Sequence, residues 1–116
     1  MLDEGLLFPR EDRVRLTKYG WNKIRGLIFE RDEELCVTCK RRGGDVHHVR
    51  TRGAYGGDVI ENLVLLCHEC HMTKAHGIEA AKWKGYLKAY LQSECIKAWN
   101  EAHRKQAEEI YKKYRR

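Results

Sequence analysis

Hydrophobic residues between positions 17 and 32 recur with the spacing of an amphipathic helix. Trp21, Ile24, Leu27 and Ile28 are separated by one helical turn or less, and charged residues fall between them. The pattern predicts a helix over residues 17–32. Trp21 is expected in the core, because a Trp on an apolar helical face is usually packed, although its ring could also stack on a base.

A strand pattern follows further along the chain. Residues 45–49 predict a short strand, and the run Asn62–Leu66 predicts the strand that returns beside it. The return strand is almost continuously apolar, which indicates burial on both faces. Gly43 and Gly44 permit the chain to reverse into this hairpin, and a glycine-rich loop over residues 50–58 joins its strands.

Residues 78–116 read as helical to the end of the chain. One apolar stripe runs through Ala81, Trp83, Leu87, Tyr90 and Leu91. A second helix is expected from about Ser93, with a stripe of Ile96, Trp99, Ala102, Gln106, Ile110 and Tyr114. We expect these helices to pack on the hairpin or to form a homodimer contact, and residues 1–16 to form an extended arm.

Length and charge bound the function. The 116 residues predict one domain spanning 1–116, and the net charge of +6 favours a polyanionic partner. There is no stretch apolar enough for a membrane span or a secretory signal, so a cytoplasmic protein without a membrane partner is expected.

Four cysteines form two Cys-x-x-Cys pairs, Cys36/Cys39 and Cys67/Cys70. Two such pairs can occupy the four corners of one tetrahedron, which predicts a structural zinc ion. Disulfides and a thioredoxin-like redox site are the alternatives, but neither pair follows a βαβ pattern and the chain lacks a secretory signal. Cys95 lies far from both pairs and is expected to be a small buried hydrophobe.

Between and beside the two pairs stand His47-His48, Asn62 and His71. This order resembles the HNH endonuclease family over roughly residues 35–77. The resemblance implies an α+β fold: a small ββα-metal core with the four-cysteine zinc site, flanked by an N-terminal helix and one or two C-terminal helices. It also implies a metal-dependent enzyme that hydrolyses phosphodiester bonds of DNA, more readily double-stranded, in a bacterium or a phage.

The resemblance assigns roles to single residues. His48 would activate water, Asn62 would tie the loop across the hairpin, and His47 and His71 would bind a catalytic divalent ion. His76 is a possible third ligand, although five residues is not the spacing of one α-helical face. Adjacent strand residues point to opposite faces, so His47 and His48 can serve one phosphate only if the strand ends or bends there.

Many family members carry Asp at the position of His47. An imidazole there moves the preference from hard Mg²⁺ toward Mn²⁺, Co²⁺, Ni²⁺ or Zn²⁺, unless Asp45 supplies a carboxylate. His68 and His103 are expected to be packed or surface residues without a site role.

Three residues are candidates for phosphate contact: Arg50 and Arg52 in the glycine-rich loop, and Lys74 on the expected metal-bearing helix. The alternative for each is a solvated surface side chain without a binding role. Two other functions stay open at this point. One is a zinc-stapled DNA-binding module without catalysis, and the other is a protein-interaction adaptor built on the terminal helices.

Overall fold

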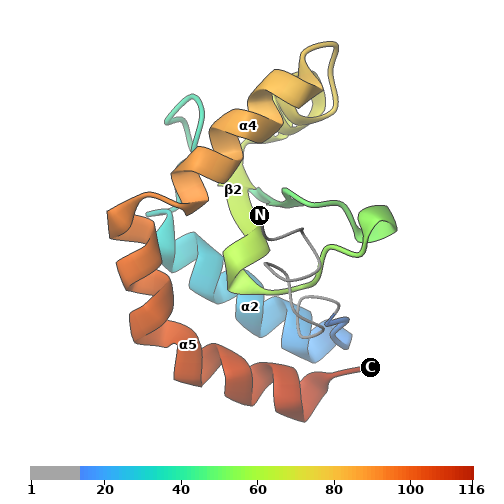
Figure 1. Ribbon diagram of the computed structural model, residues 1–116, viewed down its shortest axis with the longest axis vertical. Helices are drawn as coiled ribbons and strands as arrows, with labels where there is room; N and C mark the ends of the chain where they lie inside the picture. The colour runs from blue at the N-terminus through green and yellow to red at the C-terminus, as the bar shows by residue number, and fades with distance from the viewer. Residues whose placement is uncertain (1–13) are drawn as a thin grey trace, which may run out of the picture.

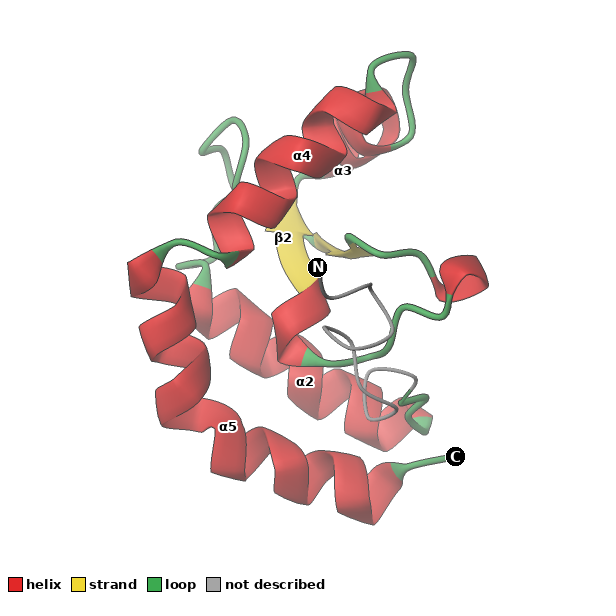
Figure 2. Ribbon diagram, viewed as in Figure 1, coloured by secondary structure: helices red, strands yellow, loops and turns green. Residues whose placement is uncertain are grey.

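The computed structural model describes residues 14–116, which combine helices with one two-stranded sheet (Figures 1 and 2). This confirms the predicted α+β class. In chain order the elements are α2 (Lys18–Arg31), β1 (Asp45–His48), η2 (Arg52–Ala54), η3 (Ile60–Asn62), β2 (Leu63–Leu66), α3 (His68–Cys70), η4 (His71–Ala75), α4 (Ala80–Leu91) and α5 (Glu94–Tyr114).

The hairpin is antiparallel, and its register pairs His47 with Val64 and His48 with Leu63. The predicted strands are present, but Asn62 is not the first residue of β2. It ends the 3₁₀ turn η3 instead, and its carbonyl accepts a hydrogen bond from the Val49 N–H at 2.9 Å. The backbone of Asn62 thus adds one more hydrogen bond beyond the ladder, while its side chain bonds the loop.

β2 lies between the two halves of the core (Figure 1). Leu63 and Leu65 pack into a cluster built by α2 and α5, whereas Val64 and Leu66 pack into a cluster with Leu87 of α4. All four residues of β2 are buried. The prediction of burial on both faces is confirmed, because alternate side chains of a strand point to opposite sides.

Helix α2 forms as predicted and is continuous through its glycines. Thr17 caps the first turn by accepting a hydrogen bond from the Gly20 N–H at 3.3 Å. Gly20 is needed for packing, because a Cβ at this position would press on the ring-bearing side chain of Tyr114 in α5. The first residues of α2 and the end of α5 therefore meet, and the Thr17 N–H donates to the Tyr114 carbonyl at 2.9 Å.

The two predicted C-terminal helices are present, but the buried stripe of α5 differs from the prediction. Ala102 and Gln106 are exposed, whereas Asn100 and Ala107 are buried. Helix α5 packs against α2, and that contact selects which face is covered. Homodimer formation through these helices stays a prediction. Within residues 14–116 no helix is both long and apolar enough to cross a membrane.

A buried ion pair joins the elements at the end of α2. Arg31 Nε lies 2.8 Å from Asp32 Oδ1, with both side chains almost completely buried. Arg31 also donates to the Ile60 carbonyl at 2.8 Å, and Asp32 accepts from the Leu65 N–H at 3.0 Å and from the Tyr90 hydroxyl at 2.6 Å. These bonds satisfy charges that would otherwise be costly to bury, and they fix α2 to β2 and α4.

The first described residues, 14–16, precede α2 and pack against the rest of the chain. Val14 and Leu16 are buried, and Leu16 pairs with Arg115 in an isolated bridge. The rest of the predicted arm, residues 1–13, lies outside the described residues.

Candidate metal centres and active site

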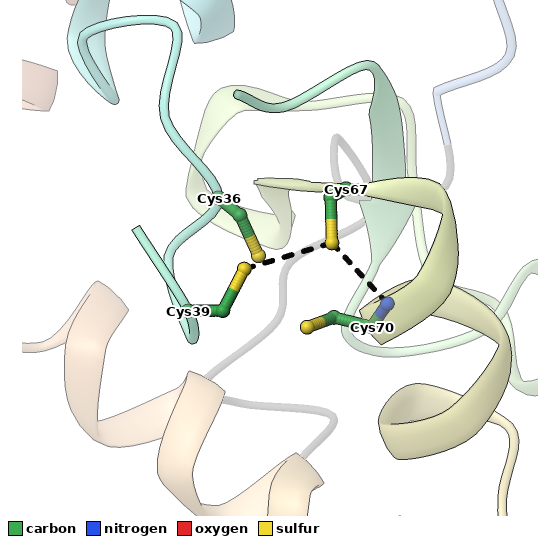
Figure 3. Close-up of side chains that lie close together, drawn as sticks. All are labelled: Cys36, Cys39, Cys67 and Cys70. Carbon is green, nitrogen blue, oxygen red and sulfur yellow. Dashed lines mark hydrogen bonds between the residues drawn. The ribbon is translucent and has the colours of Figure 1, made fainter. Parts of the chain in front are cut away.

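The four cysteines of the two Cys-x-x-Cys pairs meet in one cluster (Figure 3). Cys36 and Cys39 come from the loop after α2, whereas Cys67 is the N-cap of α3 and Cys70 is its last residue. The four sulfur atoms lie within 4.8 Å of one another, and Cys39 Sγ lies 3.6 Å from Cys67 Sγ. The structure thus brings together the four predicted ligands.

This cluster fits a zinc ion. Two sulfurs at about 2.3 Å from one tetrahedral ion are separated by about 3.8 Å, close to the observed spacing. Burial opposes ionisation of Cys36, but hydrogen bonds from the Thr38 hydroxyl and from nearby backbone N–H groups lower its pKa to about 6. A thiolate is the form that binds zinc, so the surroundings of Cys36 favour its ligating state. In the absence of an ion the pKa of Cys67 is instead raised to about 11, because a hydrogen bond from the Cys70 N–H is outweighed by burial and the neighbouring thiols.

The surroundings of the cluster tie the two pairs together. Arg41 Nε donates to Cys39 Sγ at 3.4 Å, and its other end lies 3.0 Å from Glu69 beside the second pair. The fifth cysteine corrects an expectation. Cys95 is exposed rather than buried, because it lies on the outer side of the first turn of α5.

A second cluster is made by His47, His71 and His76, whose ring nitrogens lie within 4.8 Å of one another. His47 comes from β1 and is 8% exposed, while the other two come from η4 and its C-terminal end. The ring centroids of His47 lie 5.0 Å from His71 and 5.2 Å from His76. We call this set the three-histidine cluster.

His76 joins the cluster because the segment 71–75 is a π-helix rather than an α-helix. In a π-helix the backbone hydrogen bonds join residues five apart, and the wider turn places such residues nearer to one face than an α-helix does. His71 Nε2 and His76 Nε2 are accordingly 3.2 Å apart. Two nitrogens bound to one tetrahedral zinc at about 2.0–2.1 Å would be separated by about 3.3 Å, so the pair fits a shared ion.

Asp45 orients this cluster from the side. Its Oδ2 lies 3.0 Å from His71 Nδ1 and 3.0 Å from His68 Nδ1. Burial opposes ionisation of Asp45, but hydrogen bonds from these two histidines hold its pKa below the usual value. The carboxylate thus accepts a hydrogen bond from the Nδ1–H of His71 and leaves Nε2 of that ring to the cluster, an arrangement common around metal ligands.

Burial lowers the pKa of His47 to about 4, and nearby charge on His71, His76 and His48 adds to the effect. His47 is therefore neutral at physiological pH, which is the form that binds a metal.

His48 has different partners from its neighbour. Its Nε2 lies 2.8 Å from Asp58 Oδ1, and its ring stacks on Trp21 with centroids 5.4 Å apart and planes 8° apart. The side chain of His48 remains 15% exposed. Trp21 therefore packs on the core as expected, and in addition it fixes the ring of the candidate base.

Asp58 is the site residue that sequence reasoning missed. It is fully buried, and its Oδ2 accepts from the Leu16 N–H at 3.0 Å while Arg52 donates to its Oδ1 at 3.0 Å. Burial opposes ionisation, but the bonds from His48 and Leu16 and the charge of Arg52 keep the pKa of Asp58 low. The available signal was an acidic residue directly after two glycines in an otherwise basic loop.

Asn62 fastens the loop that follows His48. Its Oδ1 accepts from the Arg50 N–H at 2.8 Å, and its Nδ2 donates to the carbonyls of Arg50 at 2.9 Å and Gly57 at 3.1 Å. Gly56 is required in this closed loop, because a Cβ there would overlap the Arg50 carbonyl. The loop is thus folded back, and Gly56 and Gly57 are buried while residues 51–55 stay exposed.

The three candidate phosphate contacts all make intramolecular contacts. Arg52 bonds Asp58 and lies over the Trp21 ring at 5.5 Å, yet its side chain stays 51% exposed. Arg50 Nε donates to the Ala54 carbonyl at 2.9 Å, and Lys74 lies over the Trp83 ring at 4.6 Å. Of the two histidines without an expected role, His68 bonds Asp45, while His103 stacks on Trp99 away from both clusters.

A comparison with protein families matches residues 36–77 to the model described as HNH endonuclease. The match begins at Cys36, ends just after His76, and contains both clusters. Of the residues described above, Trp21, which stacks on His48, and Leu16, which bonds Asp58, lie outside it. No curated protein and no solved structure matches the chain. The resemblance drawn from the sequence is confirmed over residues 36–77, which match this family model and which we call the HNH segment.

Proposed function

We propose that the protein is a metal-dependent endonuclease that hydrolyses phosphodiester bonds of double-stranded DNA. The observation that carries the proposal is the three-histidine cluster, whose ligand atoms lie within 4.8 Å of one another beside a separately oriented His48. Hydrolysis of a phosphodiester needs a base for water and a positive charge at the leaving oxygen. His48 offers the base, and the three-histidine cluster offers ligands for a cation.

His48 is the proposed base. Asp58 is ionised and accepts a hydrogen bond, so the ring nitrogen that faces it, Nε2, carries the proton. Nδ1 then holds the lone pair that can take a proton from water. Stacking on Trp21 and the closure of the loop by Asn62 keep the ring from turning, which lowers the entropic cost of reaching the reactive geometry.

His47, His71 and His76 would hold the catalytic ion. When bound, a divalent cation would stabilise the charge that develops on the phosphate and the leaving oxygen. Three neutral imidazoles with a carboxylate only in the outer position favour Mn²⁺, Co²⁺, Ni²⁺ or Zn²⁺ over Mg²⁺. Arg52 shares Asp58 with His48 and is half exposed. Its Nη1 makes no bond to Asp58 and would donate to a phosphate oxygen.

The test is a plasmid nicking assay on protein that retains its structural zinc. Supercoiled plasmid should become nicked circle with Mn²⁺, Ni²⁺ or Co²⁺ added, and less readily with Mg²⁺. Asp58→Asn should slow nicking more than it weakens DNA binding, because it removes the charge that selects the tautomer of His48. A ring ¹⁵N spectrum of His48 that loses its single-tautomer pattern in this variant would support the role.

A DNA-binding module without catalysis is the competing function. It would use the four-cysteine cluster and the basic loop but would have no need for a base fixed by Asp58. DNA binding without nicking under every metal condition would favour that module and overturn the nuclease proposal. Absence of both binding and nicking would favour the adaptor built on the terminal helices.

A further inference from the structure

Two cavities adjoin along one flank of α4. The smaller, about 180 Å³, is lined by His47 and His76 of the three-histidine cluster and by Lys84. The larger, about 610 Å³, lies between the end of α4, helix α5 and the loop that follows His48. Val49 lines both cavities, and Lys84 and Lys88, one helical turn apart on α4, line one each, so the two cavities adjoin; we call them together the groove.

Cationic side chains line this groove. Lys84 lines the smaller cavity, and Arg50, Lys88, Lys97 and Arg104 line the larger one. The acidic residues of the same two linings are Glu61 and Glu101, and Glu101 lies 3.5 Å from Arg104. Cations therefore outnumber carboxylates, and the groove attracts a polyanion.

The cations converge from separate elements. Lys84 and Lys88 are four residues apart on α4, and Lys97 and Arg104 are seven apart on α5, so each pair shares one face of its helix. At the basic end of α5, Lys113 lines a different cavity, whose lining contains no member of the three-histidine cluster. The cations of the groove differ from Lys113 because their cavities include His47 and His76 or adjoin the cavity that does.

We propose that duplex DNA with its scissile phosphate at the three-histidine cluster continues along this groove. The phosphates flanking that position are held by Lys84, Lys88, Lys97 and Arg104. This proposal rests on the proposed nuclease function, because it takes the three-histidine cluster as the reaction site. The four residues lie outside the HNH segment, so the C-terminal helices add a substrate-binding surface to it. The contacts are to phosphates, and the binding they add is independent of base sequence.

Binding to a short DNA duplex, measured by fluorescence anisotropy over a range of salt concentrations, tests the groove. The measurement uses the His48→Ala background, in which the substrate stays intact. We expect the Lys88→Glu/Lys97→Glu double variant to bind about tenfold more weakly or worse, and its slope of log affinity against log salt to fall by about 2. Lys105→Glu makes a single charge reversal elsewhere on α5, the control for Lys97→Glu alone, and should leave the slope close to that of the parent.

Lys97→Glu alone is the second variant, because Lys97 is exposed and its replacement should leave folding intact. It should lower the slope by about 1, at an unchanged melting temperature. Slopes for Lys97→Glu and Lys105→Glu that equal the parent slope would overturn the groove proposal. Nicking by the wild type is scored separately. A lowered slope without nicking would sink the nuclease function alone, while nicking with an unchanged slope would sink the groove alone.

Discussion

The four-cysteine cluster and the three-histidine cluster occur within one HNH segment, and they differ in how completely they would surround an ion. Four sulfurs fill a tetrahedron and leave no position for a substrate, which is the form of a structural site. Three imidazole nitrogens leave a position open, which is the form of a reactive one. The sulfur ligands come in two tight pairs. Of the imidazoles, His47 comes from the hairpin between those pairs, and His71 and His76 come from the π-helical turn after the second pair.

The two clusters also differ in burial. Cys36 and Cys70 are buried beneath α4 in the hydrophobic cluster that includes Leu87, whereas His76 is exposed at the end of η4. A closed, buried site suits a role in stability, and an accessible one suits exchange of ligand. Removing residues from the two clusters should therefore produce different failures.

The largest effect is expected from the sulfur ligands. Cys70→Ser removes one of four thiolates, and since structural zinc can contribute on the order of 10 kcal/mol to folding, the variant should lose zinc and much of its cooperative unfolding transition. Zinc content per chain and a circular dichroism melt measure this. Cys95→Ser is the matched control, because that cysteine is exposed and outside the cluster. Equal melts for both variants would contradict a structural role for the cluster.

The next effect separates chemistry from folding. His48→Ala should reduce nicking by about 100-fold to 10,000-fold, the usual contribution of a general base, while the melting temperature and zinc content stay near those of the wild type. His103→Ala serves as a control, because it removes a histidine that stacks on Trp99 far from either cluster. Retention of full nicking by the His48 variant would remove that residue from the mechanism.

A smaller effect distinguishes a ligand from its support. Asp45→Asn should weaken the exchangeable metal about 10-fold to 100-fold, as expected for a residue that orients a ligand, and His76→Ala should weaken it more. Calorimetric titration of Mn²⁺ or Ni²⁺ into zinc-loaded protein provides the measurement. His68→Ala removes the exposed histidine that shares Asp45 and should change affinity least. An order in which His68 matters more than His76 would argue against the π-helical ligand pair.

The smallest effect is a pH dependence of stability in protein without the exchangeable ion. The pKa of His47 is about 4 in the folded chain against an ordinary 6.5, so the unfolded chain binds the proton more readily. Stability from this residue is complete above about pH 6.5 and is lost as the pH falls toward 4, by at most about 3 kcal/mol. Denaturant titrations at several pH values measure it, and His47→Gln should flatten the profile. A stability that rises on acidification in this interval would contradict the burial of a neutral ring.

The sequence by itself determined those features whose cause is local. The Cys-x-x-Cys spacing, the two apolar strands and the helical stripe before them depend on neighbours within a few residues, so the zinc cluster, the hairpin and α2 were predictable. His47, His48, Asn62 and His71 were identified because their order along the chain resembles a known family. Their places in the structure are consistent with the roles that resemblance implies.

Tertiary structure decided the features that depend on distant partners. The π-helical turn brings His76 to His47. The five-residue spacing of His71 and His76 does not reveal this turn, because in an α-helix two residues five apart lie on different faces. Asp58 becomes a partner of His48 only because Asn62 and Gly56 fold the loop back, and the groove between α4 and α5 exists only when both helices pack around β2. These are contacts between residues far apart in sequence, and neither periodicity nor residue spacing records them.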